Sequence, residues 1–333
     1  MNKNGEAEKK QDYRVEKDSI GTKDVPQNVY YGVQSLRAAE NFHITGLNMH
    51  PEIINSLAYI KKAAAITNCE IGMLDKKKAK AIVQACDEIL EGKLHGDFIV
   101  DPIQGGAGTS LNMNANEVIA NRAIEILGGE KGDYSIINPN DDVNCGQSTN
   151  DVIPTAGKMT SLRLLKNLKK ELLRLHKALC AKAKEFDHVI KMGRTQMQDA
   201  VPIRLGQEFN AYSVAVMRDI HRMDRAMEEM CTLNMGGTAV GTGINADEAY
   251  LRRIVPNLVE VSDMEFVQAY DLIDATQNLD PFVAVSGAVK ACAVTLSKIA
   301  NDLRLMSSGP RAGFGEINLP AKQNGSSIMP GKV

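Results

Sequence analysis

The sequence has no tryptophan, and aromatic residues make up only 5% of its 333 residues. A surface on which nucleic-acid bases stack is therefore not expected. The chain also has no excess of positive charge, because 39 Lys and Arg are set against 41 Asp and Glu, for a formal net charge of -2. This balance excludes a protein that binds nucleic acid through bulk positive charge.

Long apolar runs are missing as well. No stretch approaches the ~18 consecutive apolar residues of a transmembrane helix, and the N-terminus is polar and charged, without the apolar core of a secretory signal. The six cysteines are scattered, with no Cys-x-x-Cys pair, so reduced thiols are expected in place of a zinc site or a disulfide framework. We expect a cytoplasmic protein that needs no metal and has no membrane or nucleic-acid partner.

What the chain does have is length and helical periodicity. At ~150 residues per domain, a chain of 333 residues predicts two domains. In three long segments apolar residues recur every three or four positions, which is typical of a helix with one buried face. These segments are Pro154–His188, Arg204–Leu233 and Ala275–Met306. Helices of ~30 residues span ~45 Å and bury their apolar stripes most simply against one another.

The region before Cys145 is different, because its helical segments are shorter and it shows no strong strand pattern. The sequence therefore predicts a mainly α protein. A smaller, mostly α N-terminal domain would occupy residues 1–147, and a central long-helix bundle would occupy residues 148–333. The methionines of the second long segment are expected to pack in the bundle core and not to bind a metal or haem; they are Met217, Met223, Met227 and Met230.

Five clusters rich in Gly, Ser, Thr and Asn lie between the predicted helices. They are residues 104–117, 138–151, 192–202, 234–247 and 307–333. On composition alone these clusters could equally be linkers, since turns use the same residues. Two of them lead into helical segments, at Thr109 and Ser148, where free backbone N–H groups and the helix dipole favour an anion. Neutral hydroxyls and amides at these points suit a carboxylate or phosphate ligand.

Several common site motifs are missing. Gly325–Lys332 resembles a P-loop, but five residues separate Gly325 from Gly331 instead of four, and Val333 stands where Ser or Thr would bind magnesium. The glycines of residues 237–243 do not fit G-x-G-x-x-G, and neither G-x-S-x-G nor H-E-x-x-H occurs. A nucleotide site, a serine-hydrolase elbow and a zinc-protease site are therefore not expected.

A specific resemblance appears in the last cluster. The sequence GSSIMPGK at Gly325–Lys332 matches the signature loop of the fumarase/aspartase superfamily, and the other four clusters match that superfamily in order and spacing. The resemblance covers the chain from about Tyr13 onward and implies a helical-bundle fold. Within the superfamily the chain is most similar to the aspartase branch, at YYGV (residues 30–33), QGGAGTS (104–110) and DLIDAT (271–276).

The nearest alternative is a class II fumarate hydratase. Fumarases usually have Gly-Arg-Thr-His in the third cluster, where this chain has Gly-Arg-Thr-Gln with Gln196, and they tend to have His at the place of Asn138, where they have a second, non-catalytic site. Gln196 cannot relay a proton as His can, and a hydratase would need that relay more than an ammonia-lyase would. Some aspartases also have His there, so the hydratase stays open as an alternative.

The resemblance implies reversible trans elimination of ammonium from L-aspartate to give fumarate, with no cofactor. Its catalytic base would be Ser326, acting as an oxyanion on a flexible loop and leaving an aci-carboxylate intermediate. The Ser and Thr residues at helix starts could also be helix caps. The substrate-binding positions implied are Thr109, Ser148 and Thr149 for the β-carboxylate, Asn150 with Thr109 for the amino group and Gln196 at the neighbouring position, Thr195 and Lys332 for the α-carboxylate, and, as weaker candidates, Arg37 and Ser327.

The chain departs from the family pattern at its end, because Val333 lies inside the signature. The family continues with an Asn, further bundle helices and a small C-terminal domain, and it builds each active site from three subunits of a homotetramer. We therefore expect a longer protein to be the active homotetramer. The 333-residue chain is expected to be nearly inactive and to associate through exposed apolar stripes. A truncated, non-catalytic member of the family is the third possibility.

Overall fold

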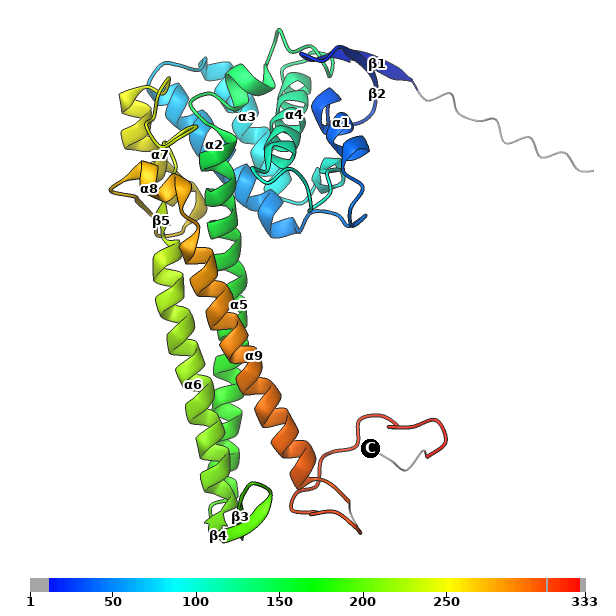
Figure 1. Cartoon of the computed structure of the whole chain (residues 1–333). Coiled ribbons are helices and arrows are strands. Elements are labelled where there is room, and N and C mark those ends of the chain that lie inside the picture. Colours follow the sequence, from blue (N-terminus) through cyan, green and yellow to red (C-terminus); the bar gives the residue numbers. More distant parts are fainter. Residues whose placement is uncertain (1–11, 310, 330–333) are drawn as a thin grey trace, which may run out of the picture. The chain divides into compact units, whose positions relative to one another are not determined.

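The computed structural model describes residues 12–309 and 311–329, and Figure 1 shows that helices dominate them. Strands in these residues form three two-stranded sheets, two antiparallel and one parallel. The expected mainly α class is confirmed. The chain has two compact units: unit 1 comprises the described parts of Met1–Leu164 with Glu228–Asp280, and unit 2 comprises Leu165–Met227 with the described parts of Pro281–Val333. The predicted domain boundary at residues 147 and 148 stays a prediction.

Unit 1 is built around helix α2, which packs against α3 and α7, while α3 in turn packs against α4. This region also contains a short hairpin of β1 and β2, which the sequence pattern did not indicate. The buried positions of β1 are the charged Arg14 and Glu16, whereas Tyr13 and Val15 are exposed, so the usual strand pattern of buried apolar residues is absent. The elements of unit 1 are β1 (Tyr13–Lys17), β2 (Thr22–Pro26), α1 (Val33–Asn41), α2 (Pro51–Glu70), α3 (Lys76–Leu90), η1 (His95–Asp97), α4 (Thr109–Ile126), the π-helix η2 (Pro139–Val143), β5 (Thr232–Leu233), α7 (Glu248–Ser262), β6 (Val267–Gln268) and α8 (Leu272–Gln277).

Unit 2 contains most of the three long helices, α5 (Thr149–Glu185), α6 (Leu205–Met230) and α9 (Asp280–Met306), together with the hairpin of β3 (Ile190–Thr195) and β4 (Gln198–Arg204). Its core joins the apolar stripes of the three helices, as their periodicity predicts. Buried members of this core are Leu165, Leu172, Leu179, Phe209, Val216, Ile220, Met223, Cys292 and Ile299. Met223 is buried in this core and Met217 and Met227 pack against it, so these three methionines fill space in the bundle as predicted. Met230 is also buried, but in unit 1.

Helix α5 begins at Thr149, five residues before the expected start at Pro154. Proline lacks the N–H that would bond to the carbonyl four residues earlier, and here that carbonyl belongs to Asn150. The Asn150 carbonyl instead accepts a hydrogen bond from Nδ2 of Asn234 at 3.0 Å. Pro154 is thus tolerated inside the helix because a side chain from the loop after β5 takes the place of the missing N–H.

The third long segment is two helices and not one. Helix α8 ends at Gln277, and α9 starts at Asp280 with Pro281 in its first turn. A continuous helix would require an N–H from Pro281 and would place the proline ring against the preceding turn. The sequence pattern of apolar residues continues across this break, so periodicity alone did not show it.

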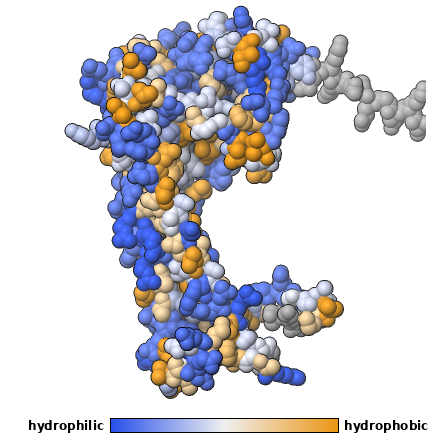
Figure 2. Space-filling model, viewed as in Figure 1, coloured by the Kyte–Doolittle hydropathy of each residue, from blue (hydrophilic) through white to orange (hydrophobic). Residues whose placement is uncertain are grey.

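Helix α9 leaves part of its apolar surface uncovered, with Val283 72% exposed and Val294 63% exposed. Figure 2 shows apolar residues on the molecular surface among polar ones. By length and hydropathy α9 is the one helix of the described residues that could cross a membrane, with 17% of its most apolar window buried in the chain. A single such helix is weak evidence, since core helices of bundles pass the same test.

Candidate active site

The five polar clusters form two groups, one in each unit. The clusters at 104–117, 138–151 and 234–247 lie together in unit 1, where they meet at the first turns of α4 and α5. The cluster at 192–202 and the described part of 307–333 lie together in unit 2, where Glu316 binds Arg194. Each group is described by its own contacts.

Ser148 caps the start of α5. Its Oγ accepts a hydrogen bond from the backbone N–H of Asn150 at 3.2 Å, and its own N–H donates to Oδ1 of Asp151 at 2.9 Å. This reciprocal pair is a capping box with Asp in place of the usual Glu. Ser148 is therefore a helix cap, which was one of the two roles that the sequence allowed for it. Thr149 and Asn150 are the first two residues of the helix.

Asp151 joins this helix start to the loop of residues 234–247. Its Oδ2 accepts hydrogen bonds from the backbone N–H groups of Gly236 and Thr238, both at 3.1 Å. Asp151 is fully buried, and burial raises the pKa of its carboxyl group although these hydrogen bonds and nearby Lys61 oppose the rise. Asn150 makes a second link, since its Nδ2 donates to the Ala239 carbonyl at 2.7 Å.

Helix α4 starts beside α5, and Thr109 is its first residue. The preceding Gly108 has a φ of +77°, and a Cβ added there would lie 2.9 Å from Cγ2 of Ile153. Only glycine permits both that conformation and that close approach. A second contact between the two helices is the hydrogen bond from Nδ2 of Asn112 to Oγ1 of Thr149 at 3.2 Å. Thr109 itself is exposed.

A buried lysine lies beneath these helix starts. Lys61 of α2 is 0% exposed, and its ammonium group donates to Oδ1 of Asn144 at 2.8 Å and to Oε1 of Gln147 at 2.9 Å. Burial lowers the pKa of Lys61 to about 7, with the negative charge of Asp151 opposing the shift. The same Asn144 oxygen also accepts from Asn112 at 3.2 Å, so a chain of amides connects Lys61 with Thr149.

In unit 2, Thr195 and Gln196 lie at the tip of the hairpin of β3 and β4. Thr195 pairs with Gln198, and the two residues between them, Gln196 and Met197, have φ values of +53° and +60°. Two left-handed residues in a two-residue loop are typical of the turn that matches the twist of antiparallel strands. All four side chains are exposed, so the hairpin presents Thr195 and Gln196 to solvent.

The signature loop is the last described part of unit 2. Ser326 is half-buried and Ser327 is exposed. Lys332, predicted to bind the α-carboxylate, lies outside the described residues. The structure therefore groups Thr109, Ser148, Thr149 and Asn150 in unit 1, and it assigns Thr195, Gln196, Ser326 and Ser327 to unit 2.

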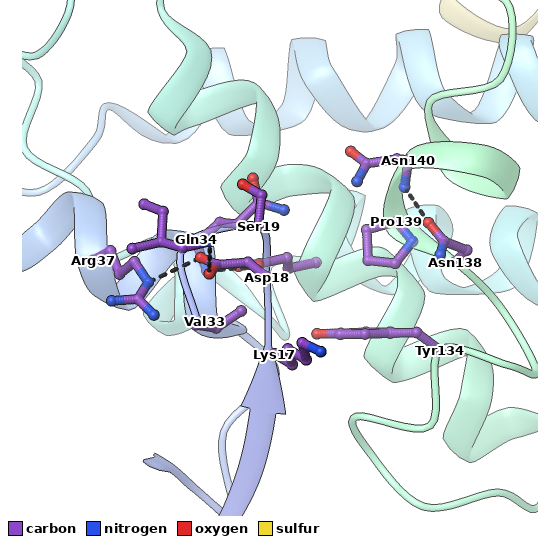
Figure 3. A pocket seen from close by; sticks show the side chains of 12 residues that line it. Lys17, Asp18, Ser19, Val33, Gln34, Arg37, Tyr134, Asn138, Pro139 and Asn140 are labelled. Carbon is purple, nitrogen blue, oxygen red and sulfur yellow. Dashed lines mark hydrogen bonds and ion pairs between the residues drawn. The ribbon is translucent and has the colours of Figure 1, made fainter. Parts of the chain in front are cut away.

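Arg37 lines a different cavity, one of about 410 Å³ in unit 1, shown in Figure 3. Its guanidinium donates to Oδ2 of Asp18 at 2.9 Å and to the Gly21 carbonyl at 3.2 Å. On the other side of this cavity Asn138 accepts from the backbone N–H of Asn140 at 2.8 Å. None of the other predicted site residues lines this cavity, so Arg37 is separate from the group at the helix starts.

The sequence missed Lys61, Asn112, Asn144 and Asp151 as parts of this region. Lys61 lies in a helix rich in alanine and other apolar residues. The sequence could have indicated it only as a charged residue at a position on the buried face of that helix. Asp151 was the fourth residue of a cap pattern that starts at Ser148, and that pattern could have indicated it. Among the described residues no group of three His, Cys, Asp or Glu could hold a metal ion.

Comparison with known proteins gives matches along the whole described chain. A family model described as "Lyase" matches residues 21–333. Aspartate ammonia-lyase of Bacillus subtilis is 59% identical over 322 residues, which cover 97% of this chain and 68% of that protein. Aspartate ammonia-lyase of Escherichia coli K12 is 49% identical, covering 96% of this chain and 68% of that protein.

Solved structures agree in fold. A structure of "fumarate lyase:delta crystallin from Brucella melitensis bound to cobalt" matches with a TM-score of 0.94 and 51% identity, over 96% of this chain and 70% of that one. A class II fumarase from Schistosoma mansoni matches with a TM-score of 0.93 and 37% identity, over 97% and 71%. The expected superfamily fold is confirmed, and the chain belongs to this lyase family, alongside aspartate ammonia-lyases and class II fumarases.

Proposed function

We propose that this protein is an aspartate ammonia-lyase, which converts L-aspartate reversibly to fumarate and ammonium. The observation that carries this proposal is the identity of 49–59% to aspartate ammonia-lyases of several bacteria over nearly the whole chain. The helix starts of α4 and α5 supply chemistry that suits a dicarboxylate, since both present threonine hydroxyl groups at the positive end of a helix.

The β-carboxylate would bind at these helix starts. Thr109 opens α4 and Thr149 opens α5, and the Asn112 hydrogen bond holds the second of them. When the C3 proton is removed, the β-carboxylate takes up the electron pair and becomes the dianionic aci-carboxylate. Donors that are already fixed in place stabilise such developing charge most effectively, and the capping box at Ser148 and Asp151 fixes this helix start.

The family resemblance assigns the amino group to Asn150 and Thr109, with Gln196 at the neighbouring position of the family site. The Nδ2 of Asn150 is already engaged by the Ala239 carbonyl, which leaves Oδ1 as the atom able to accept from the substrate's ammonium group. Thr195 and Lys332 would hold the α-carboxylate. These assignments rest on the family resemblance, and the orientation of the Asn150 amide supports one of them.

Ser326 would be the base that removes the C3 proton. A serine hydroxyl is a poor base at neutral pH, so the family mechanism requires it as an oxyanion stabilised by backbone N–H groups and a nearby cation. The C3–H electron pair moves into the aci-carboxylate. Collapse of that intermediate forms the C2–C3 double bond and breaks the C–N bond, whose electron pair leaves with ammonia; protonation then gives ammonium.

We also propose that the active enzyme is a cytoplasmic homotetramer in which different subunits supply the two groups of residues. The family resemblance implies this assembly, and the uncovered apolar surface of α9 supports association between chains.

The test is fumarate production from L-aspartate, followed by absorbance. We expect fumarate to accumulate in step with ammonium. No turnover would overturn the proposal and favour the third possibility, a non-catalytic member of the family.

A fumarate hydratase is the second candidate, and the fold match to a class II fumarase at 37% identity supports it. The two activities differ in the nucleophile that adds to fumarate. Fumarate consumption that requires ammonium identifies the lyase, whereas equal consumption without ammonium, with malate as the product, identifies the hydratase.

A further inference from the structure

The segment that leads into the signature loop is attached to the rest of unit 2 through residues 314–317. The backbone N–H groups of Glu316 and Ile317 donate to the Met306 carbonyl at 2.8 and 3.4 Å, and Ile317 packs against the bundle core. After Ile317, residues 318–329 are exposed apart from the half-buried Ser326, and these residues make no hydrogen bond with the rest of the described chain. The position of the loop is therefore set at Glu316 and Ile317.

The Glu316 side chain reaches from this attachment point to strand β3. Its Oε1 accepts from Nη2 of Arg194 at 2.7 Å, and its Oε2 lies 2.9 Å from Nζ of Lys191. The Glu316 side chain is 14% exposed. Burial by itself would raise the pKa of this carboxyl group, but the bonds from Arg194 and Lys191 outweigh burial and hold the pKa below its usual range. Glu316 is therefore ionised at neutral pH and bound to two cations.

Further contacts tie the same cations to the bundle. Lys191 also binds Oε2 of Glu208 on α6 at 2.7 Å, so its charge joins β3, α6 and the loop segment. The Arg194 guanidinium lies 4.0 Å from the ring centre of Phe314, two residues before Glu316. Because Arg194 both stacks on a ring and pairs with a carboxylate, the orientation of its guanidinium is fixed more closely than that of a lysine ammonium group would be.

Arg194 directly precedes Thr195 and Gln196 at the tip of the hairpin. We propose that Glu316 is a positioning residue for the elimination reaction: through Arg194 and Lys191 it holds the hairpin tip and the base of the Ser326 loop as one body. The proposal rests on the proposed roles of Thr195, Gln196 and Ser326. It adds that these two site segments move together and that one carboxylate couples them.

The test compares E316A and R194A with the double variant R194A/E316A. The control is E185Q, which removes the charge of an exposed carboxylate on α5 that pairs with Lys182 at 2.8 Å. Amide hydrogen exchange in the 333-residue chain reports the coupling directly. We expect E316A to increase exchange at least threefold both in residues 190–204 and in residues 314–317, with E185Q unchanged in both segments.

Kinetics of the active form provide the second readout. We expect E316A to lower kcat for aspartate at least tenfold and to raise KM by a smaller factor, because the loosened hairpin tip carries Thr195 and Gln196 whereas the proposed β-carboxylate site at the helix starts of unit 1 is untouched. R194A should behave in the same way. The double variant should be no worse than E316A alone, since either substitution already breaks the coupling. R194K should recover part of the loss, because it keeps the charge but not the stacked, forked geometry.

Three results would overturn the proposal: faster exchange in residues 314–317 with the hairpin unchanged, additive losses of kcat in the double variant, or kcat of E316A within twofold of the unaltered enzyme. The exchange experiment needs no catalytic activity. If the unaltered protein does not deaminate aspartate while E316A loosens both segments, the proposed function fails and the mechanical coupling stands.

Discussion

At the scale of single residues, Lys61 is the least expected feature of the chain. A lysine that is completely buried costs free energy in its charged form, and here amide oxygens of Asn144 and Gln147 replace its water shell. The pKa of about 7 indicates that this replacement is incomplete. Lys61 therefore makes the stability of the fold depend on pH near neutrality.

We predict that the free energy of unfolding rises with pH between 7 and 8.5. In this range the unfolded chain keeps a proton on Lys61, whose usual pKa is near 10.5, whereas the folded chain releases it. The slope should reach about 1 kcal/mol per pH unit. Toward the top of this range the Cys86 thiol begins to oppose the rise, because burial raises its pKa in the folded chain and the unfolded thiol ionises first.

The measurement is urea unfolding at several pH values for the unaltered chain, K61M and K62M. Lys62 is the matched control, because it is the neighbouring residue but pairs at the surface with Asp87 at 2.6 Å. K61M should lose the pH slope and K62M should keep it. An unchanged slope in K61M would show that another group is responsible.

At the scale of elements, the first turn of α5 determines the shape of the unit 1 site. Ser148 holds only its own helix, whereas Asp151 holds both that helix and the loop of residues 234–247. Asp151 is fully buried and Ser148 only partly. Loss of the Ser148 hydroxyl removes one acceptor at the helix start, whereas loss of the Asp151 carboxylate removes the acceptor of two buried N–H groups as well.

We predict that S148A lowers the free energy of unfolding by about 1 kcal/mol, the usual value of a helix cap. D151A should cost about 3 kcal/mol, because the buried N–H groups of Gly236 and Thr238 lose a charged acceptor. Denaturant unfolding with far-ultraviolet dichroism gives both values. Equal costs for the two variants would contradict the assignment of Asp151 as the junction.

The turn of the β3–β4 hairpin requires a left-handed backbone at Gln196 and Met197, a conformation that is strained in residues other than glycine. Met197 is 69% exposed, so its side chain gains little from packing. We predict that M197G stabilises unit 2 by about 0.5–1 kcal/mol, because glycine adopts this conformation without a Cβ penalty. M197A is the control and should give no gain. Thermal unfolding of the two variants decides the matter, and a loss of stability in M197G would contradict the turn geometry.

At the scale of the whole molecule, the uncovered apolar surface of α9 predicts association. We expect the 333-residue chain to elute above its monomer mass of 36.2 kDa in size-exclusion chromatography with light scattering. V294K should shift the chain toward the monomer, since it places a charge on this surface. N210K adds the same charge at an exposed polar position of α6 and should leave association unchanged. A monomeric unaltered chain would contradict this prediction.

The sequence predicted the long helices because their cause is local: residues such as Phe209, Val216 and Met223 repeat at the spacing of one helix face. It did not predict the break before Asp280, since apolar periodicity continues through it and only Pro281 marks it. The hairpin was also missed, because Gln196 and Met197 lack the glycine or asparagine that usually marks such a turn.

The candidate site was predicted unevenly for a similar reason. The resemblance indicated Thr109, Thr149 and Asn150 because each lies within a short sequence motif. Unit 1 brings these three residues together. The contacts that support them are between residues far apart in the chain. Lys61 and Asn144 are separated by 83 positions, and the Gly236 to Asp151 bond spans 85, distances over which no local pattern carries information.

The central claim is that a serine on the signature loop removes the C3 proton of L-aspartate. The most direct measurement is the rate of fumarate release by S326A in the catalytically active form, with S307A as the control, since Ser307 is half-buried like Ser326 and its hydroxyl bonds to the Arg304 carbonyl. We predict a loss of kcat of about 10³-fold in S326A and none in S307A. Activity of S326A within tenfold of the unaltered enzyme would contradict the account.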